Sequence, residues 1–156
     1  MSTNKFNFFL ENARLLSDKF GIVLLLYGSL GLECLTGDAL GADDIDILVP
    51  RAFIAERWHE FKALLEAQGY VLVDEHEHTF VRDGVAYSYA DIEDLESFAG
   101  ISTEDIKMHK ADGVSFLMLS LEQYLAVYRQ SSKDGYRVNV RQKKDADKIR
   151  FIESKL

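Results

Sequence analysis

Residues 24–50 read LLLYGSLGLECLTGDALGADDIDILVP, and this stretch decides the fold. Its first apolar residues are typical of a strand that is buried on both faces, and this strand ends at Gly28 and Ser29. The second apolar run carries Asp44 and Asp46 at alternate positions, so a strand there points both carboxylates to the same face. The stretch therefore predicts two core strands with polar residues gathered at their ends.

Hydrophobic periodicity and turn residues predict the elements of the rest of the chain. The expected helices cover 4–18, 30–36, 51–67, 120–132 and 142–155, and the expected strands cover 21–27, 44–49, 70–74, 78–82, 85–92, 106–110 and 114–119. Residues 93–105 are expected to form a weak helix or a loop. Asp83-Gly84 and Asp112-Gly113 predict hairpin turns, which join antiparallel strands, so the sheet should be mixed.

The fold class expected from this order is α/β (α+β), with a mixed β-sheet flanked by helices. A length of 156 residues suits one compact domain. We expect an α/β domain over 1–119 and a short C-terminal helical segment over 120–156 that packs on it. A capping box, formed by Ser120 and Gln123, predicts where that segment begins.

Charge and composition exclude several classes of protein. The chain has 18 Lys and Arg against 26 Asp and Glu, and its net charge of −8 argues against nucleic acid as a partner. Its single cysteine, Cys34, excludes an internal disulfide, and we expect it to be a small core residue. No run approaches the ~20 apolar residues of a membrane span, and the N-terminus does not look like a secretory signal. We therefore expect a cytoplasmic protein that does not enter a membrane.

Asp44 and Asp46 are the strongest candidates for chemistry. Two neighbouring carboxylates repel each other and resist ionisation unless a cation lies between them, and Mg²⁺ prefers such oxygen ligands. Gly28 allows the backbone to approach a ligand closely, Ser29 supplies a hydroxyl, and the N–H groups at the start of a helix can bind phosphate. Metal and phosphate would then meet at adjacent strand ends, as phosphoryl transfer requires.

These residues resemble the nucleotidyltransferase superfamily, whose archetype is DNA polymerase β. The segment YGSLGLECLTG, followed by DDIDILVP, is most similar to the small bacterial branch that includes lincosamide and aminoglycoside nucleotidyltransferases. The core of the resemblance covers 21–50, and a third carboxylate extends it loosely to about 93. It implies transfer of a nucleoside monophosphate from a nucleoside triphosphate, such as ATP, to a hydroxyl acceptor, with two Mg²⁺ ions.

The resemblance also implies roles for single residues. Gly28 and Ser29 match the Gly-Ser pair that holds the triphosphate, and Asp44 and Asp46 match the paired metal ligands. The family places a third acidic residue on a later strand beside this pair. Asp91 is the preferred candidate for that catalytic and metal-binding position, and Glu93, two residues later, stays open as the alternative.

Basic residues between the last two expected helices are candidates for binding the triphosphate. Lys133 and Arg137 lie in the segment that joins these helices, so they are the ones best placed to reach a site. The acceptor can be a small molecule or a protein side chain, and a homodimer is compatible with so small a chain.

A second interpretation stays open. The spacer from Ser29 to Asp44 is 14 residues long, and no basic residue precedes the Asp pair as it often does in the antibiotic-type members. A catalytically weak or inactive binding or regulatory module with the same fold, similar to one half of a toxin–antitoxin pair, fits these departures. A plain structural α/β domain is a third interpretation.

Overall fold

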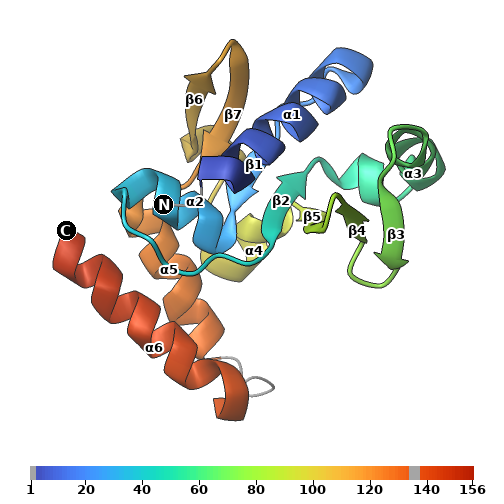
Figure 1. Ribbon diagram of the computed structural model, residues 1–156. Helices are drawn as coiled ribbons and strands as arrows, with labels where there is room; N and C mark the ends of the chain where they lie inside the picture. The colour runs from blue at the N-terminus through green and yellow to red at the C-terminus, as the bar shows by residue number, and fades with distance from the viewer. Residues whose placement is uncertain (1–2, 134–137) are drawn as a thin grey trace.

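The computed structural model describes residues 3–133 and 138–156 (Figure 1). Its helices are α1 (Thr3–Phe20), α2 (Gly28–Thr36), α3 (Trp58–Ala67), α4 (Asp94–Ala99), α5 (Leu121–Ser132) and α6 (Val138–Lys155), with 3-10 turns at Arg51–Ile54 and Thr103–Asp105. Its strands are β1 (Leu25–Tyr27), β2 (Ile45–Val49), β3 (Val71–Asp74), β4 (Thr79–Arg82), β5 (Val85–Asp91), β6 (Lys107–Ala111) and β7 (Val114–Met118).

The seven strands form one sheet in the order β3-β4-β5-β2-β1-β7-β6. The central strand β2 is antiparallel to β1 and parallel to β5, and β1 is parallel to β7. The three hairpins that the structure describes, β3–β4, β4–β5 and β6–β7, are antiparallel. The expectation of a mixed sheet within an α/β fold is therefore confirmed.

Helices cover both faces of the sheet. On one face α1 and α3 pack against the strands through Phe9, Leu16 and Phe61, all fully buried. On the other face, apolar residues of α4, α5 and α6 form a second core around Leu25 and Leu48. Figure 1 shows α5 and α6 side by side, next to α2. Within the described residues, no helix has the length and apolar character needed to cross a membrane.

Local signals in the sequence are confirmed at three places. The Ser120 hydroxyl accepts a hydrogen bond from the Gln123 N–H, and the Gln123 side chain accepts one from the Ser120 N–H, so the capping box begins α5. Both expected hairpin turns have positive φ at their two central residues, at 52° and 75° for Asp83-Gly84 and 49° and 78° for Asp112-Gly113. Such turns match the twist of the strands that they join.

The prediction of one helix over 51–67 is wrong. A 3-10 turn ends at Ile54, and at Ala55 the backbone leaves helical geometry, with φ of −125° and ψ of −107°. The break lets Phe53 and Phe61 both reach the core, where their ring centroids lie 6.0 Å apart. The Arg57 guanidinium lies 4.5 Å from the centre of the Phe53 ring and covers this corner.

Candidate functional site

The turn from β1 into α2 brings the backbone of Gly28 against Asp46. The helix begins at Gly28, whose φ of +63° is a conformation that favours glycine. A Cβ atom at this position would lie 2.5 Å from Oδ2 of Asp46, so no other residue fits here without movement. Glycine is therefore needed at this position for two reasons, the backbone angle and the close approach of the carboxylate.

The two aspartates of the motif lie at the start of β2. Asp46 lies opposite Tyr27 on β1 and opposite Ser88 on β5, and it is half-buried. Asp44 precedes the strand and is exposed. Both residues line the same pocket as Gly28 and Ser29, so the structure brings these four predicted site residues together.

A buried glutamate shapes the loop that leads to the aspartates. Glu33 on α2 is fully buried, and its Oε2 accepts hydrogen bonds from the N–H groups of Leu40 and Ala42, at 2.8 and 3.0 Å. These bonds hold the segment that ends at Asp44. Glu33 was not among the predicted site residues, although a single acidic residue inside an apolar helix is a signal that could have identified it.

A tyrosine from α5 supports the same turn from the other side. The buried Tyr124 hydroxyl donates a hydrogen bond to the Gly28 carbonyl at 3.0 Å. Burial, together with neighbouring groups that include Tyr128 and Asp46, raises the pKa of Tyr124 well above 10.0, so the phenol stays a neutral donor. A Cβ atom at Gly31 would lie 2.2 Å from this hydroxyl, so α2 and α5 touch closely. No sequence pattern distinguished Tyr124 from an ordinary core residue.

A pocket of about 690 Å³, called the main pocket below, lies between α2, the start of β2, α5 and α6. This volume is in the range of small-molecule sites. Tyr27, Tyr124 and Tyr128 line it with rings stacked in series, at centroid distances of 6.4 and 6.1 Å. Phe98 and Phe151 add two more aromatic side chains.

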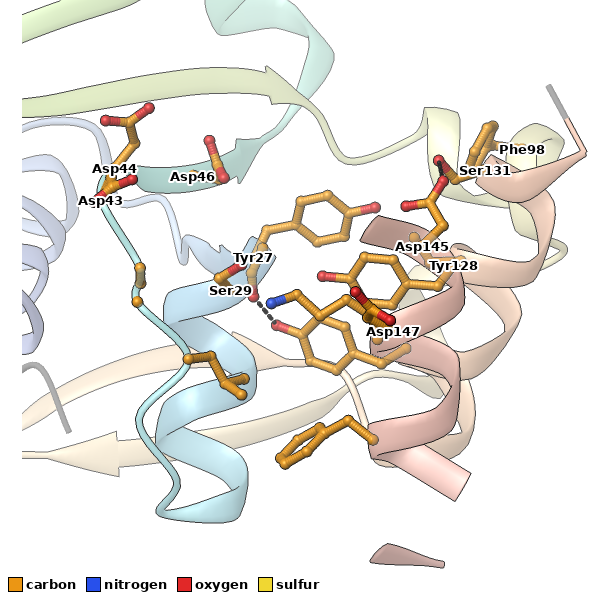
Figure 2. A pocket seen from close by; sticks show the side chains of 18 residues that line it. Tyr27, Ser29, Asp43, Asp44, Asp46, Phe98, Tyr128, Ser131, Asp145 and Asp147 are labelled. Carbon is orange, nitrogen blue, oxygen red and sulfur yellow. Dashed lines mark hydrogen bonds between the residues drawn. The ribbon is translucent and has the colours of Figure 1, made fainter. Parts of the chain in front are cut away.

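Acidic side chains lie on two sides of the main pocket. Figure 2 shows Asp43, Asp44 and Asp46 along one side and Asp145 and Asp147 on the other. Asp145 is only 3% exposed, and its Oδ2 accepts a hydrogen bond from the Ser131 hydroxyl at 2.8 Å. Among the described residues that line the pocket, Lys148 is the single basic one. The pocket thus combines aromatic rings with an excess of negative charge.

The structure does not bring Asp91 to the Asp44 and Asp46 pair. Asp91 lies opposite Val49, three residues beyond Ser88, and a rise of ~3.3 Å per residue separates it from Asp46 by about 10 Å along the sheet. Its carboxylate instead forms an ion pair with Arg51. Glu93 follows the strand and is exposed. In the described part of the chain, no group of three or more His, Cys, Asp or Glu side chains could hold a metal ion.

Asp91 borders a smaller cavity of about 440 Å³, the side pocket, which also reaches Asp46 and Tyr27. His76 and His78 line this cavity from the turn between β3 and β4. The two pockets therefore meet at Asp46.

Of the two basic residues predicted to bind triphosphate, Lys133 is exposed at the C-terminal cap of α5 and does not line the main pocket. Arg137 lies outside the described residues. The half-buried Cys34 packs against the core as expected, and burial together with the Glu33 carboxylate raises the pKa of its thiol from 9.0 to about 11. This thiol is therefore no thiolate nucleophile at neutral pH.

Comparison with known proteins places this geometry in context. No protein-family model matches the chain. The chain is 36% identical over 147 residues to the uncharacterized protein YnaI of Bacillus subtilis (strain 168), with 94% of each chain covered.

Solved structures show the same fold. An antigenic nucleotidyltransferase-like protein from Paracoccidioides brasiliensis superposes with a TM-score of 0.61 and 18% identity, over 90% of this chain and 71% of that one. ANT(2″)-Ia, solved in complex with adenylyl-2″-tobramycin, gives a TM-score of 0.57 and 15% identity, over 94% and 87% of the two chains. The fold is thus nucleotidyltransferase-like, as the motif predicted.

Proposed function

This chain belongs to the same protein family as YnaI of Bacillus subtilis and has the nucleotidyltransferase fold, and from that premise we propose that it is a magnesium-dependent nucleotidyltransferase. The reaction moves a nucleoside monophosphate from a nucleoside triphosphate to a hydroxyl acceptor. The acceptor oxygen forms a bond to the α-phosphorus, and the bond from this phosphorus to the oxygen bridging to the β-phosphate breaks. Pyrophosphate leaves, and the hydroxyl proton passes to water.

The observation that carries the proposal is the contact between Gly28 and Asp46. Because a Cβ atom at Gly28 would lie 2.5 Å from the Asp46 carboxylate, the first turn of α2 starts directly beside this carboxylate. Free N–H groups at a helix start bind phosphate, and carboxylates bind divalent cations. A phosphate-binding element and a metal-binding element in contact support a site for a metal-bound nucleotide.

The residues present fit Mg²⁺, because Asp44 and Asp46 both line the main pocket and offer hard oxygen ligands there. Bound Mg²⁺ lowers the pKa of an acceptor hydroxyl and offsets the charge of the leaving pyrophosphate. The Ser29 hydroxyl and the N–H groups of the first turn of α2 orient the phosphates. The hydrogen bond from Tyr124 to the Gly28 carbonyl holds this turn in place.

Asp91 is left out of the proposed metal site. Its ion pair with Arg51 and its position three residues beyond Ser88 support a structural role at the end of β5. The proposal therefore assigns metal binding to Asp44 and Asp46 alone.

The lining of the main pocket supports a small acceptor that carries hydroxyl groups and a positive charge. Aromatic faces attract organic cations, and the buried Asp145 offers a carboxylate to a protonated amine. The tobramycin portion of the compound bound to ANT(2″)-Ia is that protein's own ligand, and it agrees with this class of acceptor.

Thermal unfolding with each nucleoside triphosphate, with and without Mg²⁺, tests the proposal. A ligand at 100 times its dissociation constant stabilises the folded state by about 2.7 kcal/mol, which raises the unfolding midpoint by about 5–10 °C for a chain of this size. We expect such a shift with Mg²⁺ and one triphosphate, and release of pyrophosphate when a hydroxyl acceptor is also present. The shift should vanish in the Asp44→Asn/Asp46→Asn variant.

Asp91→Asn is the matched control for this experiment, because it makes the same chemical change on the neighbouring strand. We expect it to retain the nucleotide-dependent shift. If the Asp44→Asn/Asp46→Asn variant binds the triphosphate with Mg²⁺ and releases pyrophosphate as the unaltered protein does, the proposed reaction is wrong.

One observation favours a second candidate function, a regulatory module without catalysis. Ser88 occupies the position opposite Asp46 on the adjacent parallel strand, and its hydroxyl is hydrogen-bonded to that of Thr79 at 2.8 Å. A site with two carboxylates can bind a nucleotide without transferring it. A nucleotide-dependent shift without pyrophosphate release, together with a stable protein partner, would support this function.

A further inference from the structure

The strands on either side of Asp46 place hydroxyl side chains, not carboxylates, next to it. On β1 the residue opposite Asp46 is Tyr27, and on β5 it is Ser88. The resemblance to the nucleotidyltransferase superfamily implies a further carboxylate beside the pair, and with it two metal ions. We propose instead that Asp44 and Asp46 hold a single divalent cation together with the nucleotide, and that Ser88 sets this number, an inference that rests on the proposed function.

The register of β5 against β2 decides which side chain of β5 can share a further cation with Asp46. Adjacent strands lie about 4.7–4.9 Å apart, and Mg²⁺ binds oxygen ligands at about 2.0–2.1 Å, so two opposing side chains on one face can reach the same ion. The register pairs Asp46 with Ser88. The next residue of β5, Tyr89, points to the other face, where it is 1% exposed in the core. Position 88 is therefore the place on β5 for an additional metal ligand.

Ser88 offers an uncharged hydroxyl at that place, and this hydroxyl already has a partner. Its Oγ lies 2.8 Å from Oγ1 of Thr79 on β4, and the two hydroxyls share a hydrogen bond. Thr79 lies opposite Ser88, so Asp46, Ser88 and Thr79 form one row across three strands. The charge of the ligands governs how tightly a site holds a divalent cation, and beyond Asp46 this row adds no negative charge.

Asp91, the acidic residue of β5, has other partners. Its Oδ2 accepts a hydrogen bond from Nε of Arg51, and its Oδ1 accepts one from the backbone N–H of Glu93 at 2.8 Å. It lies opposite Val49, three residues beyond Asp46 on β2. A cation shared with Asp46 would require Asp91 to break both bonds and to reach across that distance.

The side pocket leaves room for a larger residue at position 88. Ser88 is half-buried and lines this cavity of about 440 Å³ together with Asp46. An aspartate at position 88 can therefore place its carboxylate beside that of Asp46. Ala90 lines the same cavity from the same strand and face, but it is exposed and lies opposite Leu48. An aspartate at position 90 is about 7 Å farther along the strand, so it is a matched control.

Counting bound Mn²⁺ by electron paramagnetic resonance tests the inference, because Mn²⁺ accepts the same oxygen ligands as Mg²⁺ and its spectrum separates free from bound ions. The full chain is titrated with Mn²⁺ and a nucleoside triphosphate analogue whose α,β-bridging oxygen is replaced by methylene, so that no transfer takes place. We expect the unaltered protein to bind a single ion tightly and Ser88→Asp to bind a second one. Ser88→Asn, which adds the same bulk without the charge, and Ala90→Asp should each bind a single ion.

Each outcome has a distinct meaning. Two tightly bound ions in the unaltered protein overturn the inference while the proposed function stands, and this result does not depend on the folding of any variant. A single ion in a folded Ser88→Asp protein shows that Ser88 does not set the number. A second ion in Ala90→Asp shows that any carboxylate on this face recruits it, so the argument from register is wrong. If the unaltered protein binds neither the analogue nor Mn²⁺, the proposed function itself fails, and this inference fails with it.

Discussion

The two walls of the main pocket are built in different ways. The wall formed by β1, α2 and β2 uses residues that are close in sequence, and its key contact joins the backbone of Gly28 to Asp46. The wall formed by α5 and α6 uses side chains that reach over long separations, such as Tyr124, which lies 96 residues from Gly28. The first wall therefore tolerates almost no change in shape, whereas the second depends on single hydrogen bonds and charges.

Gly28→Ala should distort the first wall and cause the largest loss of stability. The left-handed φ of +63° and the contact at 2.5 Å from Asp46 both penalise a Cβ atom, at a combined cost of about 2–4 kcal/mol in the free energy of unfolding. Gly41→Ala is the matched control, because Gly41 has a φ of +69° but no atom within 4 Å of the added Cβ. Chemical denaturation should show the smaller loss for Gly41→Ala, about 1–2 kcal/mol. Equal losses would show that the Asp46 contact costs nothing.

Glu33→Gln should loosen the loop of the first wall and have the next largest effect. The fully buried carboxylate accepts two N–H groups, so we expect a loss of about 1–3 kcal/mol in stability and weaker binding of the metal-bound nucleotide. Glu66→Gln on the exposed face of α3 should stay within ±0.5 kcal/mol of the unaltered protein. Urea denaturation measures both changes, and a Glu33→Gln protein as stable as the control contradicts the assigned role.

Tyr124→Phe removes the bond by which the second wall supports the first. A single hydrogen bond to a buried carbonyl contributes about 0.5–1.5 kcal/mol, so the loss of stability should be in this range. Tyr70→Phe is the control, because the buried Tyr70 hydroxyl meets no hydrogen-bond partner among the described residues and its removal should be neutral or stabilising. If both variants unfold at the same denaturant concentration, the Tyr124 bond does not support the turn.

Cys34 is expected to have the smallest effect on stability at neutral pH. The rate at which its thiol is modified tests whether α2 packs against the core as described. Because the folded pKa of the thiol is about 11 rather than 9.0, iodoacetamide should modify it about 100-fold more slowly at pH 8 than in the unfolded chain. The raised pKa favours the folded state below pH 9, and this contribution is lost as the pH rises toward 11. Equal modification rates in the folded and unfolded chain would show that the thiol is not buried.

The local rules of sequence predicted the elements well where one signal dominates. The capping box at Ser120 and the Asp-Gly turns at residues 83 and 112 form as expected, because each depends on the chemistry of two to four neighbouring residues. The helix expected over 51–67 is wrong, because the core positions of Phe53 and Phe61 require a turn at Ala55. Tertiary packing outweighed helical periodicity there.

The residues of the candidate site likewise divide into those that local patterns predicted and those that depend on tertiary structure. Gly28, Ser29, Asp44 and Asp46 were predicted from the sequence because strand alternation and the Gly-Ser turn place them together. The family resemblance implied that Asp91 lies beside them, but the register of β5 against β2 puts Ser88 there instead. Pairing between residues that are 42 positions apart in the sequence follows from the whole sheet, and no local pattern encodes it.

The sequence by itself determined the fold class and the Gly-Ser and Asp residues that line one wall of the main pocket, because glycine conformation, strand alternation and helix starts are properties of neighbouring residues. Only the tertiary structure decided which side chains complete the pocket. Tyr124, Asp145 and Lys148 read as ordinary helical residues until α5 and α6 pack across α2. Their surroundings depend on that packing, because burial and the partner of each charge arise only when distant segments meet.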